Sequence, residues 1–153
     1  MNTHEILMAL EAMHPAQDGW VFMPELRAGT GYRGLAQQRV DAWAIQCWGT
    51  GGKLCRVSNR RRAFEVKVTE EDLRRELLNP DKRWYALAIS HEFYFVAPKG
   101  LVNLKHLTKD DGLIEWDGAA LRVVKAPRVR EAMPPRWDFI AGLLRRLKRN
   151  EMK

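Results

Sequence analysis

The sequence has few cysteines and histidines, and it contains no long hydrophobic run. Two cysteines, Cys47 and Cys55, are too few for a disulfide framework or for a zinc site built from Cys-x-x-Cys pairs. No apolar run approaches the ~18 residues that a membrane span requires. Glu5 and Glu11 interrupt the apolar residues at the N-terminus, where a signal peptide needs an uninterrupted core. We therefore expect a cytoplasmic protein without a membrane partner.

Positively charged residues outnumber negatively charged ones. The 153 residues carry a formal net charge of +7, while 46% of them are hydrophobic and 29% are charged. This composition is typical of a folded globular chain, and the length is that of one ordinary domain. Clustered Lys and Arg side chains bind phosphates and release counterions, so the charge favours a polyanionic partner such as nucleic acid.

The periodicity of apolar residues predicts one mixed α/β sandwich with the order α-β-β-β-α-α-β-β-β-α. We expect a single domain over 1–153, with its core at about 3–127 and a basic C-terminal helix at about 134–150. The buried stripe of that last helix is expected at Trp137, Ile140, Ala141 and Leu144. The expected helices are 3–13, 69–78, 81–90 and 136–149, and the expected strands are 20–23, 39–47, 63–68, 92–97, 112–116 and 120–125. We expect Thr3 to cap the first helix and Thr69 to cap the second.

Three charged side chains lie on predicted strands, where charge is normally avoided. Asp41 stands within RVDAWAI, and Glu65 and Lys67 stand within AFEVKV. Strand alternation places Glu65 and Lys67 on one face, and Asp41 joins them if the two strands are neighbours. A carboxylate in an apolar strand is costly unless it is paired, hydrogen-bonded or bound to a cation. Two carboxylates and a strand carbonyl make an oxygen-rich site of the kind that Mg²⁺ or Mn²⁺ prefers.

Asp41 followed by Glu65-Val66-Lys67 on the next strand resembles the D…(D/E)XK motif of the PD-(D/E)XK nuclease superfamily. The proline of that motif is absent, because Arg39-Val40 precedes Asp41. A narrower similarity covers residues 5–127 and is to phage- and bacteria-encoded proteins close to the MmcB-like DNA repair family. It is carried by RVDAWAI, FEVKVTEEDLRREL, NPDKR and EFYFVAPKGLV, with the AGTGY loop upstream.

The resemblance implies a restriction-endonuclease-like core, in which helices flank a central mixed β-sheet. Its order is α-β-β-β-α-β, followed here by a C-terminal hairpin and helix. In the superfamily, the counterparts of Asp41, Glu65 and the carbonyl of Val66 ligate the metal, and the lysine at position 67 positions the attacking water. A further acid often comes from the first helix, where Glu5 stands, and Glu25 competes for this place.

The expected function is Mg²⁺- or Mn²⁺-dependent hydrolysis of phosphodiester bonds in DNA, in repair, recombination or phage DNA processing. The first alternative is a catalytically inactive nuclease-fold protein that only binds DNA. The second is a structural protein whose acids and lysine are merely paired. A homodimer would supply two sites for two strands, but the sequence indicates no interface. Basic residues near the motif are candidates for phosphate contacts: Arg60, Arg61, Arg62, Lys82 and Arg83.

Overall fold

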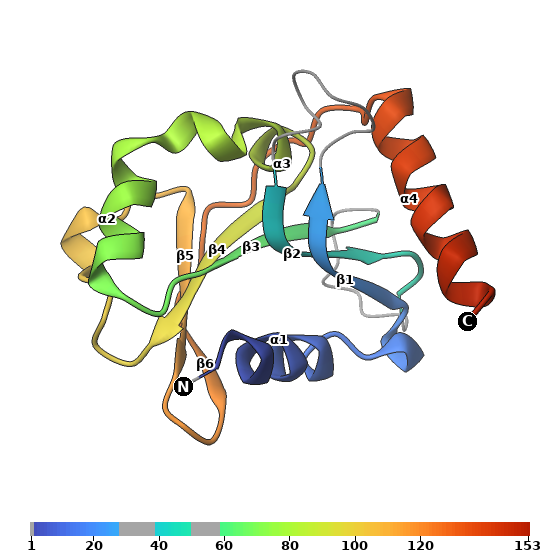
Figure 1. Ribbon diagram of the computed structural model, residues 1–153. Helices are drawn as coiled ribbons and strands as arrows, with labels where there is room; N and C mark the ends of the chain where they lie inside the picture. The colour runs from blue at the N-terminus through green and yellow to red at the C-terminus, as the bar shows by residue number, and fades with distance from the viewer. Residues whose placement is uncertain (1, 28–38, 50–58) are drawn as a thin grey trace.

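A six-stranded mixed β-sheet forms the centre of this α/β protein, with helices on both of its faces (Figure 1). The structure is a computed structural model that describes residues 2–27, 39–49 and 59–153, without the side chains of Pro80 and Lys82. The Ala28–Gly34 loop lies outside the described residues. The helices are α1 (Thr3–Ala12), α2 (Glu70–Leu78), α3 (Trp84–Ala88) and α4 (Trp137–Glu151). The strands are β1 (Trp20–Arg27), β2 (Arg39–Gln46), β3 (Arg61–Val66), β4 (Glu92–Pro98), β5 (Asp111–Trp116) and β6 (Leu121–Lys125).

The strands lie in the sheet in the order in which they occur in the chain. β1, β2 and β3 form an antiparallel meander, and β5 and β6 form an antiparallel hairpin. β4 is parallel to both β3 and β5. Parallel neighbours need a crossover connection, and α2 and α3 supply it between β3 and β4. The end of β3 therefore leads directly into α2.

Each face of the sheet has its own hydrophobic core. On one face, Ile6 of α1 packs in a cluster with Phe64 of β3. On the other face, Leu73 of α2, Tyr85 of α3 and Phe139 of α4 belong to a second cluster. Figure 1 shows α1 on the opposite side of the sheet from α2 and α3. The inner strands are covered on both faces, so they are apolar without strict alternation.

Local signals set where two elements begin and turn. Thr69 caps α2 as predicted, since its hydroxyl accepts from the amide of Asp72 at 3.2 Å. At α1 the cap is Asn2, whose side chain accepts from the amide of His4, and the prediction that Thr3 caps this helix is wrong. The β5–β6 turn contains Gly118 at φ +97°, a left-handed conformation that favours glycine.

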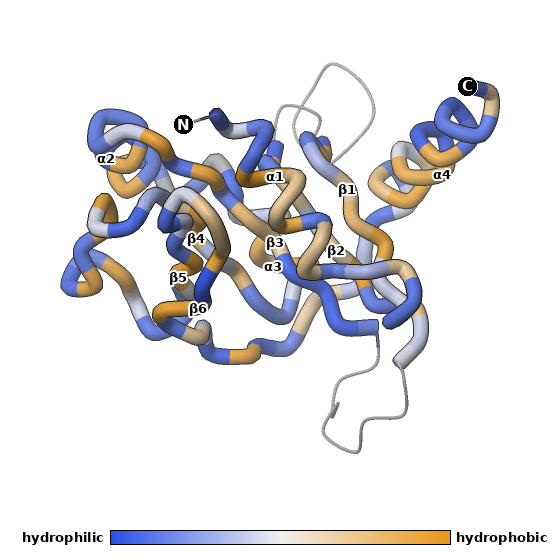
Figure 2. The backbone as a smooth tube through the Cα atoms, turned by 90° about the horizontal axis from the view of Figure 1, so that it is seen from below, coloured by the Kyte–Doolittle hydropathy of each residue, from blue (hydrophilic) through white to orange (hydrophobic). Residues whose placement is uncertain are grey.

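The buried stripe predicted for α4 is wrong. Phe139 faces the core and packs edge-on against Trp43 and Tyr85, with ring centroids 5.5 and 5.8 Å away. Trp137 and Leu144 are 82% and 62% exposed instead. Hydrophobic and hydrophilic residues alternate along α4 (Figure 2), so the sequence offers more than one apolar stripe.

Among the described residues, no helix combines the length and the apolar character that crossing a bilayer would require. The longest, α4, has 15 residues and carries Lys148 and Arg149 in its last turn. These cations lie near the helix carbonyl end, where the helix dipole favours positive charge.

Candidate active site

Asp41 and Glu65 meet where β2 separates from β3. The pairing of these strands runs from Ile45 to Ala42, and one residue further Asp41 stands opposite Glu65. The Oδ2 atom of Asp41 accepts a hydrogen bond from the amide of Val66 at 2.8 Å, in place of a backbone ladder bond. The two carboxyl groups lie close enough for the charge of Asp41 to act on that of Glu65. The structure therefore brings together the two acids that the sequence singled out.

Burial raises the pKa of Glu65 to about 8, and the nearby charge of Asp41 adds to the effect. Lys67 opposes the shift but does not cancel it. Two carboxyl groups in such proximity cannot both ionise easily, so Glu65 keeps its proton at neutral pH. A cation can replace the proton of Glu65, because it would offset the repulsion between the two carboxylates.

Lys67 follows β3 directly and lies between two carboxylates. Its Nζ atom is 3.3 Å from Oε2 of Glu65 and 3.2 Å from Oε2 of Glu76. Burial by itself would lower the pKa of Lys67, but the charges of Glu65 and Glu76 raise it above its ordinary value. The side chain is therefore an ammonium ion at neutral pH. It can stabilise negative charge on a phosphate, whereas it cannot accept a proton.

Glu76 is a site residue that sequence reasoning missed. The helix α2 begins at its Thr69 cap and turns Leu73 toward the core, and Glu76 follows one turn later on the same face. Its Oε1 atom accepts from Arg83 at 2.9 Å, so Glu76 joins Lys67 to Arg83. An acid three residues after an apolar core position was the signal that could have identified it.

Arg83 was predicted to contact nucleic acid, and the structure places it in the interior. Its side chain is only 6% exposed, and its guanidinium lies over Phe93 and Phe95, at 4.8 and 5.0 Å from the ring centroids. With Glu76 as its ion-pair partner, it does not reach a surface phosphate. The prediction that Arg83 contacts nucleic acid is therefore wrong. Arg83 forms a buried ion pair with Glu76 instead.

The other predicted metal ligands are not drawn into the acidic pair. Glu5 is exposed, and its carboxylate accepts from the amide of Asn2 at 3.4 Å, which completes a capping box. Glu25 is exposed on β1 with a left-handed φ of 53°, and its charge acts on Arg146 of α4. The amide of Val66 donates to Asp41, and the role of the Val66 carbonyl as a metal ligand stays a prediction.

The three arginines at the start of β3 are bound within the protein. Arg60 and Arg62 donate to Oε2 of buried Glu92 at 2.7 and 2.9 Å, and Arg61 donates to the carbonyl of Ile89 at 2.8 Å. They lie at the beginning of β3, whereas Glu65 lies near its end. Their contact with nucleic acid stays a prediction without support from this geometry. The side chain of Lys82 lies outside the described residues.

His14 belongs to the same buried charge cluster. Its Nδ1 atom donates to the carbonyl of Leu10 at 2.7 Å, so its Nε2 atom is free to accept from Arg62 at 3.1 Å. Burial, supported by the charge of Arg62, lowers the pKa of His14 to about 4. The imidazole is therefore neutral in the folded protein, although it becomes charged in the unfolded chain below about pH 6.5.

The protein is expected to lose stability through His14 as the pH falls from 7 to 4. In this window the unfolded chain binds a proton that the folded protein excludes, so acid favours unfolding. A shift of this size corresponds to roughly 3 kcal/mol at pH 4, at about 1.4 kcal/mol per pKa unit. Urea unfolding at pH 7 and pH 4 should show a smaller loss for His14→Gln than for the unchanged protein. Equal losses would contradict this assignment.

The acidic pair fits a divalent cation that keeps much of its water. Within residues 2–27, 39–49 and 59–153, no group of three or more His, Cys, Asp or Glu side chains is arranged to hold a metal ion. Asp41 and Glu65 nevertheless provide two neighbouring carboxyl groups, and that of Glu65 is buried. Mg²⁺ often binds through one or two carboxylates and retains several waters. The donor chemistry therefore suits Mg²⁺ or Mn²⁺.

Comparisons with known proteins support the fold and leave the activity open. No protein family matches the chain, and no curated protein matches it. Among solved structures, the chain is similar to the SPO1766 protein of unknown function from Silicibacter pomeroyi, with a TM-score of 0.60 and 18% sequence identity. The similarity covers 97% of this chain and 90% of that one. It shows a shared α/β fold over almost the whole length.

Proposed function

We propose that this protein is a metal-dependent nuclease of the PD-(D/E)XK type that hydrolyses phosphodiester bonds in DNA. The observation that carries the proposal is the convergence of Asp41, Glu65 and Lys67. The amide of Val66, next to Glu65, donates to Asp41 at 2.8 Å, and the Lys67 ammonium is 3.3 Å from Glu65. The order α1, β1, β2, β3, α2, β4 is also the order that the resemblance implies.

The proposed role of each residue in the site follows from its charge. Asp41 and Glu65 would hold the metal, which when bound polarises the scissile phosphate and lowers the pKa of a water. Lys67 is cationic, so it stabilises the negative charge that develops on the phosphate oxygens and orients the attacking water. Glu76 holds the ammonium of Lys67 from the side of α2, and Arg83 holds Glu76. This arrangement keeps the lysine in place before substrate arrives.

The proposal is tested by incubating the protein with supercoiled, linear, single-stranded and branched DNA, with Mg²⁺, with Mn²⁺ and with EDTA. We expect cleavage of at least one substrate with a metal and none with EDTA. Absence of turnover on every substrate with both metals would overturn the proposal. Cleavage that persists in EDTA would remove the metal from the mechanism.

A second function, DNA binding without cleavage, is favoured by one observation. Lys67 forms ion pairs with both Glu76 and Glu65. In the described part of the chain, no third acid joins Asp41 and Glu65 in an arrangement that could hold a metal ion. A nuclease fold with an incomplete metal shell would retain a DNA-binding surface. Measurable DNA affinity together with no cleavage in any metal would support this alternative.

A further inference from the structure

Two arginines face each other at one end of the β1–β2 ladder. Arg27 is the last residue of β1, Arg39 is the first residue of β2, and the two are direct partners across the strands. Both are exposed. Like charges directly opposite each other destabilise a sheet unless an anion lies between them. The pair therefore has the character of a site for an anion.

Neither arginine finds a carboxylate in the protein. Among the residues that the structure describes, none forms an ion pair or hydrogen bond with the guanidinium of Arg27 or Arg39. The two segments outside the description, 28–38 and 50–58, contain no Asp or Glu in the sequence. No carboxylate of those segments can neutralise the pair. An external anion is thus the remaining source of opposite charge.

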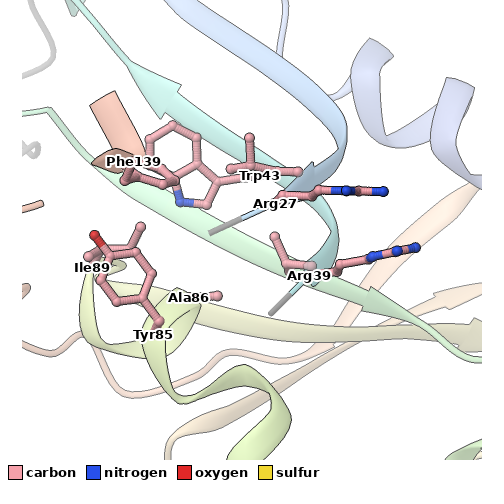
Figure 3. Close-up of a pocket in the computed structure, with 9 residues that line it drawn as sticks. Arg27, Arg39, Trp43, Tyr85, Ala86, Ile89 and Phe139 are labelled. Carbon is pink, nitrogen blue, oxygen red and sulfur yellow. The ribbon is translucent and has the colours of Figure 1, made fainter. Parts of the chain in front are cut away.

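The two arginine side chains extend outward from the rim of an apolar pocket. Arg27 and Arg39 line a small pocket whose other walls are apolar and include Trp43, Tyr85 and Phe139. Figure 3 shows the two side chains extending side by side in the same direction, away from these aromatic rings. The guanidinium groups are therefore exposed, and an anion from solvent can reach both of them.

The position of the pair connects it with the candidate active site. Arg39 precedes Asp41 by two residues on β2. Two residues of a strand span about 7 Å, which is close to the distance between neighbouring phosphorus atoms along one DNA strand. A strand whose scissile phosphate lies at Asp41 and Glu65 can therefore present a neighbouring phosphate to the arginines.

We propose that Arg27 and Arg39 together bind a backbone phosphate of DNA adjacent to the scissile phosphate. Paired guanidinium groups match the oxygens of a phosphate through charge-assisted hydrogen bonds. The choice of DNA as the ligand rests on the proposed nuclease function, whereas the anion site itself rests on the arginine pair. The pair fixes the register of the strand relative to the acids.

The test compares two double variants with equal loss of charge. Arg27→Gln/Arg39→Gln removes the pair, and Arg122→Gln/Lys105→Gln removes two exposed cations elsewhere, one of them on β6 at the opposite edge of the sheet. The probes are a fluorescein-labelled 20-nucleotide strand and its duplex, with Kd measured by anisotropy in EDTA at several salt concentrations. Thermal unfolding confirms that both variants are folded.

We expect Arg27→Gln/Arg39→Gln to bind at least about tenfold more weakly to whichever of the two probes the unchanged protein binds more tightly. The slope of log Kd against the logarithm of the salt concentration should fall by about 0.7 to 0.9, which corresponds to one lost phosphate contact. The control variant should change Kd less than about threefold. Unchanged affinity, equal losses in both variants, or no binding of either probe by the unchanged protein would each overturn the inference.

The outcomes separate this inference from the nuclease proposal. An unchanged protein that binds DNA but never cleaves it, with affinity lost in Arg27→Gln/Arg39→Gln, would support the phosphate site and remove the nuclease. Cleavage by the unchanged protein and full affinity in the arginine-pair variant would support the nuclease and remove the phosphate site.

Discussion

Replacement of Glu65 with Gln is expected to slow metal-dependent DNA cleavage by about a thousandfold. The amide keeps the size of the side chain but cannot ionise when a metal displaces the proton of Glu65. A metal ion contributes several kcal/mol to transition-state stabilisation, and about 1.4 kcal/mol corresponds to a factor of ten in rate. Asp41→Asn should have a similar effect. Single-turnover cleavage at saturating Mg²⁺ measures both.

The matched control is Glu71→Gln on the exposed side of α2. Glu71 forms only a surface pair with Arg75, at 3.6 Å, and surface pairs contribute little to stability. Its cleavage rate should stay within about twofold of the unchanged protein. A Glu65→Gln protein that keeps a tenth of the activity would show that Glu65 does not hold the metal.

The same substitution tests the pKa of Glu65 in the absence of metal. The folded pKa of about 8 lies above the ordinary value of 4.5, so the folded protein retains a proton that the unfolded chain loses. Stability from this group is present below about pH 4.5 and is lost as the pH rises toward 8. Urea unfolding in EDTA should show this decline, and Glu65→Gln should reduce it.

Replacement of Glu76 with Leu is expected to lower the free energy of unfolding by about 3–5 kcal/mol. The substitution leaves Arg83 buried without its ion-pair partner and removes one of the two carboxylates beside Lys67. Removing one member of a buried ion pair costs this much because an uncompensated charge stays in the interior. Denaturant unfolding at pH 7 measures the change.

The double variant Glu76→Leu/Arg83→Met distinguishes a lost charge pair from a general packing defect. Replacing both partners with apolar residues removes the unpaired charge, and such replacements are often neutral. Most of the lost stability should therefore return. A double variant that is as unstable as Glu76→Leu would show that packing around α2, and not the charge of Arg83, determines the effect.

Periodicity and local motifs predicted most of the elements. Every predicted helix and strand in the described residues has a counterpart, because strand alternation and the Thr69 cap are local properties of the chain. The boundaries differ where pairing extends an element, as in β1, which continues to Arg27. The proximity of Asp41 and Glu65 was also predictable, since consecutive strands usually pair.

By itself, the sequence determined the order of elements, the excess positive charge and the two acids, Asp41 and Glu65, on neighbouring strands. The prediction that Lys67 lies on the same strand as Glu65 is wrong, because β3 ends at Val66. Only the tertiary structure decided which face of α4 meets the sheet, that Arg60, Arg62 and Arg83 are bound by internal acids, and that Glu76 lies beside Lys67. Periodicity reports which residues share a face of one element. Which faces meet depends on contacts between residues distant in the sequence, and those contacts form only when the whole sheet is assembled.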